Sequence, residues 1–128
     1  MRYDDFIGRV QDRARLDSTH RAMNAVRATL STLSERLTLE EAKDLAAQLP
    51  NEIGACLSIS PVMHAQRLSL DEFFYRVATR EKAHPPDAIY HARVVMEVLS
   101  EAVTKGEMED VLGQLPAEFR TFVRSGGV

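Results

Sequence analysis

Apolar residues recur along the chain at intervals of three and four residues, the spacing that gathers them on one face of an α-helix. One such stripe runs from Met23 to Leu37, and a second runs from Ile89 to Val103. No stretch of the sequence alternates apolar and polar residues as a half-buried β-strand does. The pattern therefore predicts an all-α protein.

The two stripes belong to a longer internal repeat. Residues 22–57 align without gaps with residues 88–123, and twelve of the thirty-six pairs are identical, where chance would supply about two or three. The tripeptide Gln-Leu-Pro at 48–50 returns in register at 114–116. Nearer the N-terminus the offset changes from 66 to 67 residues, which places one additional residue in a predicted loop. The chain is thus predicted to contain two tandem copies of one unit.

Each copy is predicted to form four helices, so we expect a bundle of about eight helices in one all-α domain over residues 1–128. The first repeat covers about residues 3–57 and the second about residues 70–124. The connector, residues 58–69, contains too many apolar residues for a free linker. Each unit of about 60 residues would bury only about 60% of its surface alone, so the two copies are expected to share an interface.

Helix starts are marked by capping boxes, in which a hydroxyl and a glutamate three residues later each accept a hydrogen bond from a free backbone amide. The pairs are Thr38 with Glu41, Ser69 with Glu72, and Thr104 with Glu107. Acidic residues in these first turns also face the positive end of the helix dipole. We expect them to serve stability, with a metal or acid–base role as the alternative. Pro50 and Pro116 end the third helix of each copy.

Composition narrows the class of protein. The 128 residues are 45% hydrophobic and 27% charged, which suits a globular chain with a core of its own. The single cysteine, Cys56, excludes an internal disulfide. Without an apolar leader or an apolar run of about 18 residues, the sequence predicts a cytoplasmic protein with no membrane contact. A net charge of -3 argues against a general nucleic-acid coat.

The Leu-Pro-x-Glu turns at 49–52 and 115–118, following a long helix and a capped short helix in each copy, give the chain a recognisable pattern. It resembles the bacterial family catalogued as domain of unknown function 2267, over about residues 3–123. The resemblance implies a compact helical bundle in a small bacterial protein, and it supplies no active-site residues.

Motifs of catalysis or of cofactor binding are missing from the sequence, and we predict no catalytic residue, metal or cofactor. The histidines do not share the i, i+3 or i, i+4 spacing of a helical metal site; they are His20, His64, His84 and His91. His91 is the hardest to set aside, because it adjoins an apolar stripe and its repeat equivalent is Ala25. Cys56 is interpreted as a small buried hydrophobe, since no basic neighbour activates its thiol.

A charged ladder at i, i+4 spacing occurs in both copies: Asp5, Arg9 and Arg13, then Glu72, Arg76 and Arg80. The spacing stacks each series along one helix face. One interpretation is an ordinary solvated face. The other is a contact surface, internal or intermolecular, on which arginines meet carboxylates. We take Arg9, Arg13, Arg76 and Arg80 as candidate partner-binding residues.

These observations predict a non-enzymatic helical interaction module that binds a protein partner or associates with itself. Nucleic acid is not the expected partner, because residues 51–57, the candidate recognition helix of the first copy, are mostly small or apolar, and its counterpart pairs Arg120 and Arg124 with Phe119 and Phe122, which are expected to be buried. The alternative is a small-ligand-binding or enzymatic bundle with a pocket between the two repeats. A cavity that gathers His91, Tyr90 and a carboxylate would favour that alternative.

Overall fold

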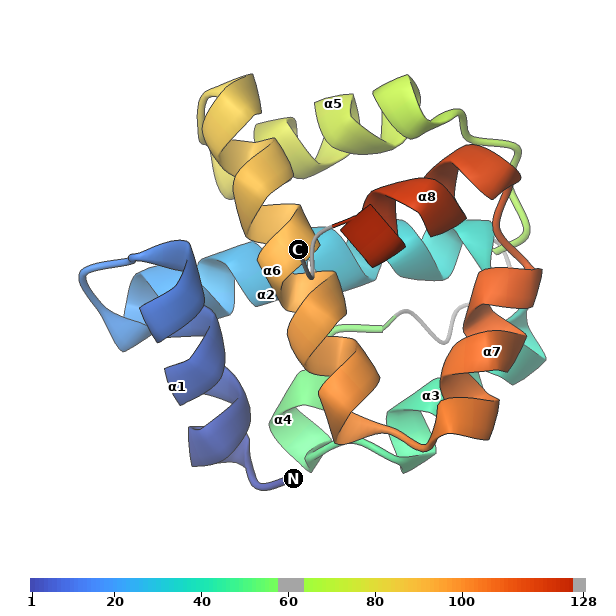
Figure 1. Ribbon diagram of the computed structural model, residues 1–128, viewed down its shortest axis with the longest axis horizontal. Helices are drawn as coiled ribbons and strands as arrows, with labels where there is room; N and C mark the ends of the chain where they lie inside the picture. The colour runs from blue at the N-terminus through green and yellow to red at the C-terminus, as the bar shows by residue number, and fades with distance from the viewer. Residues whose placement is uncertain (58–63, 126–128) are drawn as a thin grey trace.

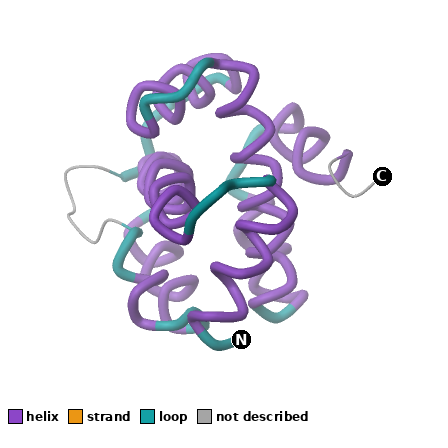
Figure 2. The backbone as a smooth tube through the Cα atoms, turned by 90° about the vertical axis from the view of Figure 1, so that its left-hand side faces the viewer, coloured by secondary structure: helices purple, strands orange, loops and turns teal. Residues whose placement is uncertain are grey.

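The computed structural model describes residues 1–57 and 64–125, and over these ranges its regular secondary structure is entirely helical (Figure 1, Figure 2). The all-α prediction is confirmed. The helices are α1 (Tyr3–Ala14), α2 (Thr19–Arg36), α3 (Leu39–Ala47), α4 (Asn51–Gly54), α5 (Leu70–Glu81), α6 (Pro85–Ala102), α7 (Lys105–Gly113) and α8 (Ala117–Ser125). We refer to residues 1–57, with α1 to α4, as the first half, and to residues 64–125, with α5 to α8, as the second half.

Helix lengths correspond between the halves. The first helices, α1 and α5, have 12 residues each, the second helices, α2 and α6, have 18, and the third helices, α3 and α7, have 9. The fourth helices differ, with 4 residues in α4 and 9 in α8. The tandem repeat itself stays a prediction, which the matching lengths support.

The helix starts differ from the predicted capping boxes in one respect. The Thr38 hydroxyl accepts a hydrogen bond from the Glu41 amide at 3.2 Å, as predicted. The backbone amide of Thr38, however, donates to Oε1 of Gln114 in the other half at 2.9 Å, and the amide of Thr104 donates to Gln48 at 2.8 Å. A glutamine from the opposite half thus takes the place expected for the box glutamate.

Helices of each half pack against helices of the other half. Helix α1 contacts α6 as well as α2, and α5 contacts α2 as well as α6 (Figure 1). The short helices α3 and α7 also lie against each other. All eight helices contribute to one cluster of buried apolar side chains, so the core crosses from one half to the other.

The described part of the connector also packs against the body. Leu68 is buried, and the amides of Ala65 and Gln66 donate to backbone carbonyls at the end of α2, at 2.9 and 2.8 Å. The other apolar connector residues of the sequence interpretation, within 59–63, lie outside the described residues.

Phe73 offers a test of this core. Its ring is 1% exposed and lies edge-on to Phe119, with centroids 5.2 Å apart. We expect Phe73→Ala to lower the free energy of unfolding by about 3–5 kcal/mol, because it removes buried apolar area and leaves a cavity. Tyr75→Ala, on the same helix but at a residue 69% exposed, should change it by less than about 0.5 kcal/mol. Urea denaturation followed by circular dichroism measures both, and equal losses would contradict the assigned core.

Candidate functional site

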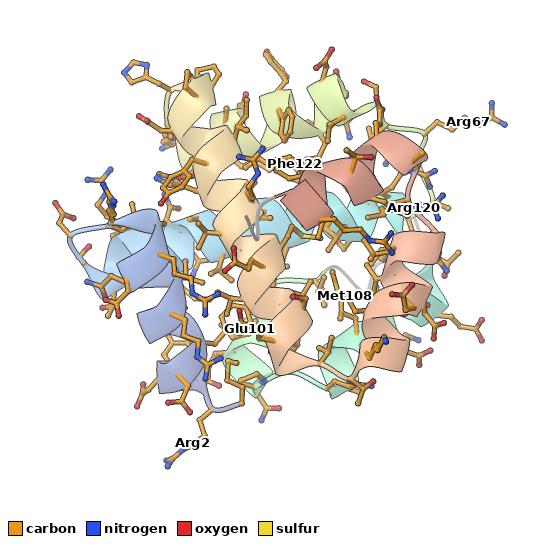
Figure 3. All side chains as sticks on the ribbon, viewed as in Figure 1. Arg2, Arg67, Glu101, Met108, Arg120 and Phe122 are labelled. Atoms are coloured by element: carbon orange, nitrogen blue, oxygen red, sulfur yellow. The ribbon has the colours of Figure 1, made fainter. Side chains whose placement is uncertain are left out.

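The two candidate arginines of α1 bind a carboxylate of α6. Arg13 contacts both oxygens of Glu101, with Nη1–Oε2 at 2.6 Å and Nη2–Oε1 at 2.9 Å, and Arg9 Nη1 reaches Oε1 at 2.8 Å. Arg13 also contacts Glu97 at 2.6 Å. Figure 3 shows Glu101 on the side of α6 that faces α1. The hydrogen bond from Arg13 is the main reason that the pKa of Glu101 lies below its usual value.

The two candidate arginines of α5 bind a carboxylate of α2 in the corresponding way. Arg80 contacts both oxygens of Glu35, with Nη1–Oε2 at 2.5 Å and Nη2–Oε1 at 3.1 Å, while Arg76 Nη1 lies 3.3 Å from Oε1. The Glu35 side chain is only 4% exposed. Arg80 also donates to the Thr32 hydroxyl at 2.8 Å.

The charged ladder therefore joins the two halves of the same chain. Each arginine pair lies on the first helix of one half and meets a glutamate on the second helix of the other half. This matches the internal form of the predicted contact surface. Binding of a separate partner by Arg9, Arg13, Arg76 or Arg80 stays a prediction.

The two glutamates of the ladder differ in burial, and their removal should differ in cost. We expect Glu35→Ala to destabilise the protein by about 1–3 kcal/mol, because it leaves two guanidinium groups without their buried acceptor. Glu101→Ala removes a carboxylate that is 33% exposed and should cost less than about 1 kcal/mol. Chemical denaturation of both variants measures the difference, and the reverse order would contradict these roles.

A second polar cluster lies where α5 ends and α6 begins. Glu81, the last residue of α5, contacts Nδ1 of His91 on α6 through its Oε2, and both residues are 7% exposed. Asn24 of α2 donates to the backbone carbonyl of Glu81 at 3.0 Å. The other carboxylate oxygen of Glu81, Oε1, is buried and has no hydrogen-bond partner.

This cluster forms one wall of a pocket of about 330 Å³ between the halves. The first half supplies residues of α2, and the second half supplies the end of α5, the turn that follows and the start of α6. Arg21, Asn24, Glu81, Lys82, Ala83, His84, Asp87 and His91 line it. The volume lies at the lower end of the range for pockets that hold small ligands.

Local sequence explains why these side chains meet. Lys82 adopts a left-handed conformation with φ 59°, which ends α5 and turns the chain sharply. His84 then precedes α6, whose first two residues, Pro85 and Pro86, suit a first turn because they need no hydrogen bond from their nitrogens. The turn is therefore short, and it brings Glu81 and His91 together.

The pair has a defined chemistry. A carboxylate at Nδ1 fixes the orientation of an imidazole and leaves its other nitrogen to act on a ligand. Nε2 of His91 has no hydrogen-bond partner among the residues that the structure describes. Arg21 and Lys82 add two cationic groups to the same pocket. The arrangement can therefore bind a polar molecule by hydrogen bonds and by charge.

Sequence reasoning singled out His91 but missed Glu81. At the repeat offsets of 67 and 66 residues, their equivalents are Ala14 and Ala25, and both alanines are buried. A buried polar pair in one copy that replaces two alanines in the other is the signal that could have found the site. Tyr90 does not line the pocket; its hydroxyl donates to the backbone carbonyl of Arg13.

Other candidate chemistry is limited. Cys56 follows α4 in a turn, half-buried, with its thiol 3.6 Å from the Glu52 carbonyl, and burial raises its pKa. A raised pKa disfavours the reactive thiolate.

Within residues 1–57 and 64–125, no group of three or more potential metal ligands is placed to bind an ion. Over the same ranges, no helix combines the length and the apolar character needed to cross a bilayer.

The fold and the pocket define an all-helical bundle with a polar site between its two halves. The family model DUF2267, described as an uncharacterized conserved protein, matches residues 3–122, and the chain belongs to this family. The family resemblance seen in the sequence is thereby confirmed. A comparison with curated proteins finds no match.

Proposed function

We propose that the protein binds a small acidic molecule in the pocket between its halves, with His91 as the central contact. The observation that carries this proposal is the buried Glu81–His91 pair, which leaves Nε2 of His91 as the ring nitrogen available to a ligand. A carboxylate at Nδ1 fixes the orientation of the imidazole, so the second ring nitrogen is positioned to contact a molecule in the pocket.

The pocket carries two cations, Arg21 and Lys82, beside the two carboxylates Glu81 and Asp87, and the cations can meet an anionic group on the ligand. Lys82 forms no ion pair with the described residues, and Arg21 has only a solvent-exposed contact with Asp17 at 3.6 Å. Both cations are therefore free to meet a carboxylate or a phosphate. Asp87 is exposed in the same pocket and favours a ligand that also carries a hydrogen-bond donor.

A catalytic role for the same pair is a second candidate. An imidazole oriented by a carboxylate is the arrangement of a general base, and the pocket gives a substrate access to it.

The protein-binding or self-associating module, which the sequence favoured, stays a prediction, as does the cytoplasmic location. Its main support, the charged ladder, is engaged between the halves of the chain.

Ligand binding can be tested by thermal shift against a panel of small carboxylates and phosphate esters. A ligand at 100 times its Kd should stabilise the wild-type protein by about 2.7 kcal/mol. The double variant Glu81→Ala/His91→Ala places in the second half the alanines that the first half already has, so it should fold and lose the ligand-induced shift.

Lys82→Ala should weaken binding of the same ligand, whereas Lys43→Ala is the matched control, since Lys43 is an exposed lysine on α3 outside the pocket lining. A ligand that stabilises the double variant as much as the wild type would contradict the proposal.

Light scattering of the unliganded protein tests the self-associating module, because a protein that is a monomer at every concentration does not self-associate.

A further inference from the structure

A pair of acidic residues outside the pocket lining lies in the contact between α3 and α7. Glu41 of α3 and Glu107 of α7 are equivalent at the repeat offset of 66 residues, and each is only 8% exposed. We propose that these two carboxyl groups share one proton and act as a pH-sensitive clasp between the halves, closed at neutral pH and loosened in alkaline solution.

The surrounding contacts hold the two glutamates together. Helices α3 and α7 contact each other, and both can be followed at the lower right of Figure 1. Gln48 accepts a hydrogen bond from the Thr104 amide, and Gln114 accepts one from the Thr38 amide. These reciprocal bonds fix the start of each helix to the end of the other. They also take the amides that the two glutamates would otherwise bind, which leaves both carboxyl groups free to turn inward.

The carboxyl groups have an unmet need for a hydrogen bond. Oε2 of Glu41 and Oε2 of Glu107 are both buried, and neither has a hydrogen-bond partner. Two carboxylates that share a buried site cannot both ionise without strong repulsion. One proton between them removes that repulsion and supplies the missing hydrogen bond.

The groups around the pair strengthen this effect. Burial, followed by the hydrogen bond and the charge of Glu107, raises the pKa of Glu41 to about 8, and Asp110 of α7 and Asp44 of α3 add to the rise. Helix α4 also packs against α3, and its one charged residue, Glu52, is exposed. The charges that raise the pKa of Glu41 are all negative, and the lysines of the two helices, Lys43 of α3 and Lys105 of α7, are exposed.

The direction of the pH effect follows from linkage. Between the ordinary glutamate pKa of 4.5 and about 8, the folded protein keeps a proton that the unfolded chain has released. Rising pH therefore favours the unfolded chain over this interval, by up to about tenfold in the folding equilibrium constant per pH unit. Above pH 8 the folded protein also loses the proton, and two adjacent negative charges then push α3 and α7 apart.

Carbon-detected NMR titration of the wild-type side-chain carboxyls tests the shared proton directly. We expect the Glu41 carboxyl to titrate near pH 8, and hydrogen exchange of the α3 and α7 amides to accelerate above that pH by more than base catalysis alone explains. Glutamates that all titrate near pH 4.5 would overturn the proposal.

Glu41→Gln provides the second test, because its neutral amide can donate to Glu107 at every pH. The thermal midpoint of this variant should change less between pH 5 and 9 than that of the wild type. Glu40→Gln is the matched control on the same turn, since Glu40 is exposed, and it should keep the wild-type profile. If Glu41→Gln folds and also keeps that profile, the proposal fails; if it does not fold, the wild-type titration decides. Neither outcome depends on the pocket ligand.

Discussion

The buried carboxylate of Glu35 constrains how the two halves of the chain pack together. The side chain is 4% exposed, and a charge buried to that degree is stable only with hydrogen-bonded partners of opposite sign. The partners, Arg76 and Arg80, lie more than forty residues further along the chain on α5. Helix α2 can therefore bury its charge only after α5 has docked on it. The apolar core contains residues of both halves, so it too is completed only when the halves pack together. The ion pairs and the core therefore couple the folding of the two halves.

The docking of α5 on α2 also builds the pocket. Arg80, bound to Glu35 and Thr32, fixes the last turn of α5 against α2, and Glu81 is the next residue. Its backbone carbonyl then accepts from Asn24, and its carboxylate meets His91 on α6. A register error of one residue along α5 would move Glu81 away from both. The ion pairs between the halves thus act as positioning contacts for a site in which they take no chemical part.

Local features of the fold could be predicted from the sequence because they depend on neighbouring residues. The helical period and the threonine caps at Thr38 and Thr104 depend on residues only a few positions apart, and the structure confirms both. The partners of the charged ladder could not be predicted, because Arg9 and Glu101 are 92 residues apart. Spacing along one helix carries no information about the helix that packs against it. The orientation of long side chains could not be predicted either. Glu41 has the spacing of a capping residue, but Gln114 of the other half accepts the hydrogen bond of the Thr38 amide, and Oε2 of Glu41 is buried.

The structure compensates buried carboxylates in three different ways, and the differences bear on function. Glu35 is neutralised by the guanidinium groups of Arg76 and Arg80 on the other half. Glu81 is held against an imidazole at a pocket, where the same contact also orients a group toward a ligand. Glu41 lies among acidic groups, which together with burial raise its pKa. A chain that needed only stability could have used arginine in all three places. The other two positions lie in different contacts, Glu81 between α5 and α6 within the second half and Glu41 between α3 and α7 across the halves, so each can be altered separately.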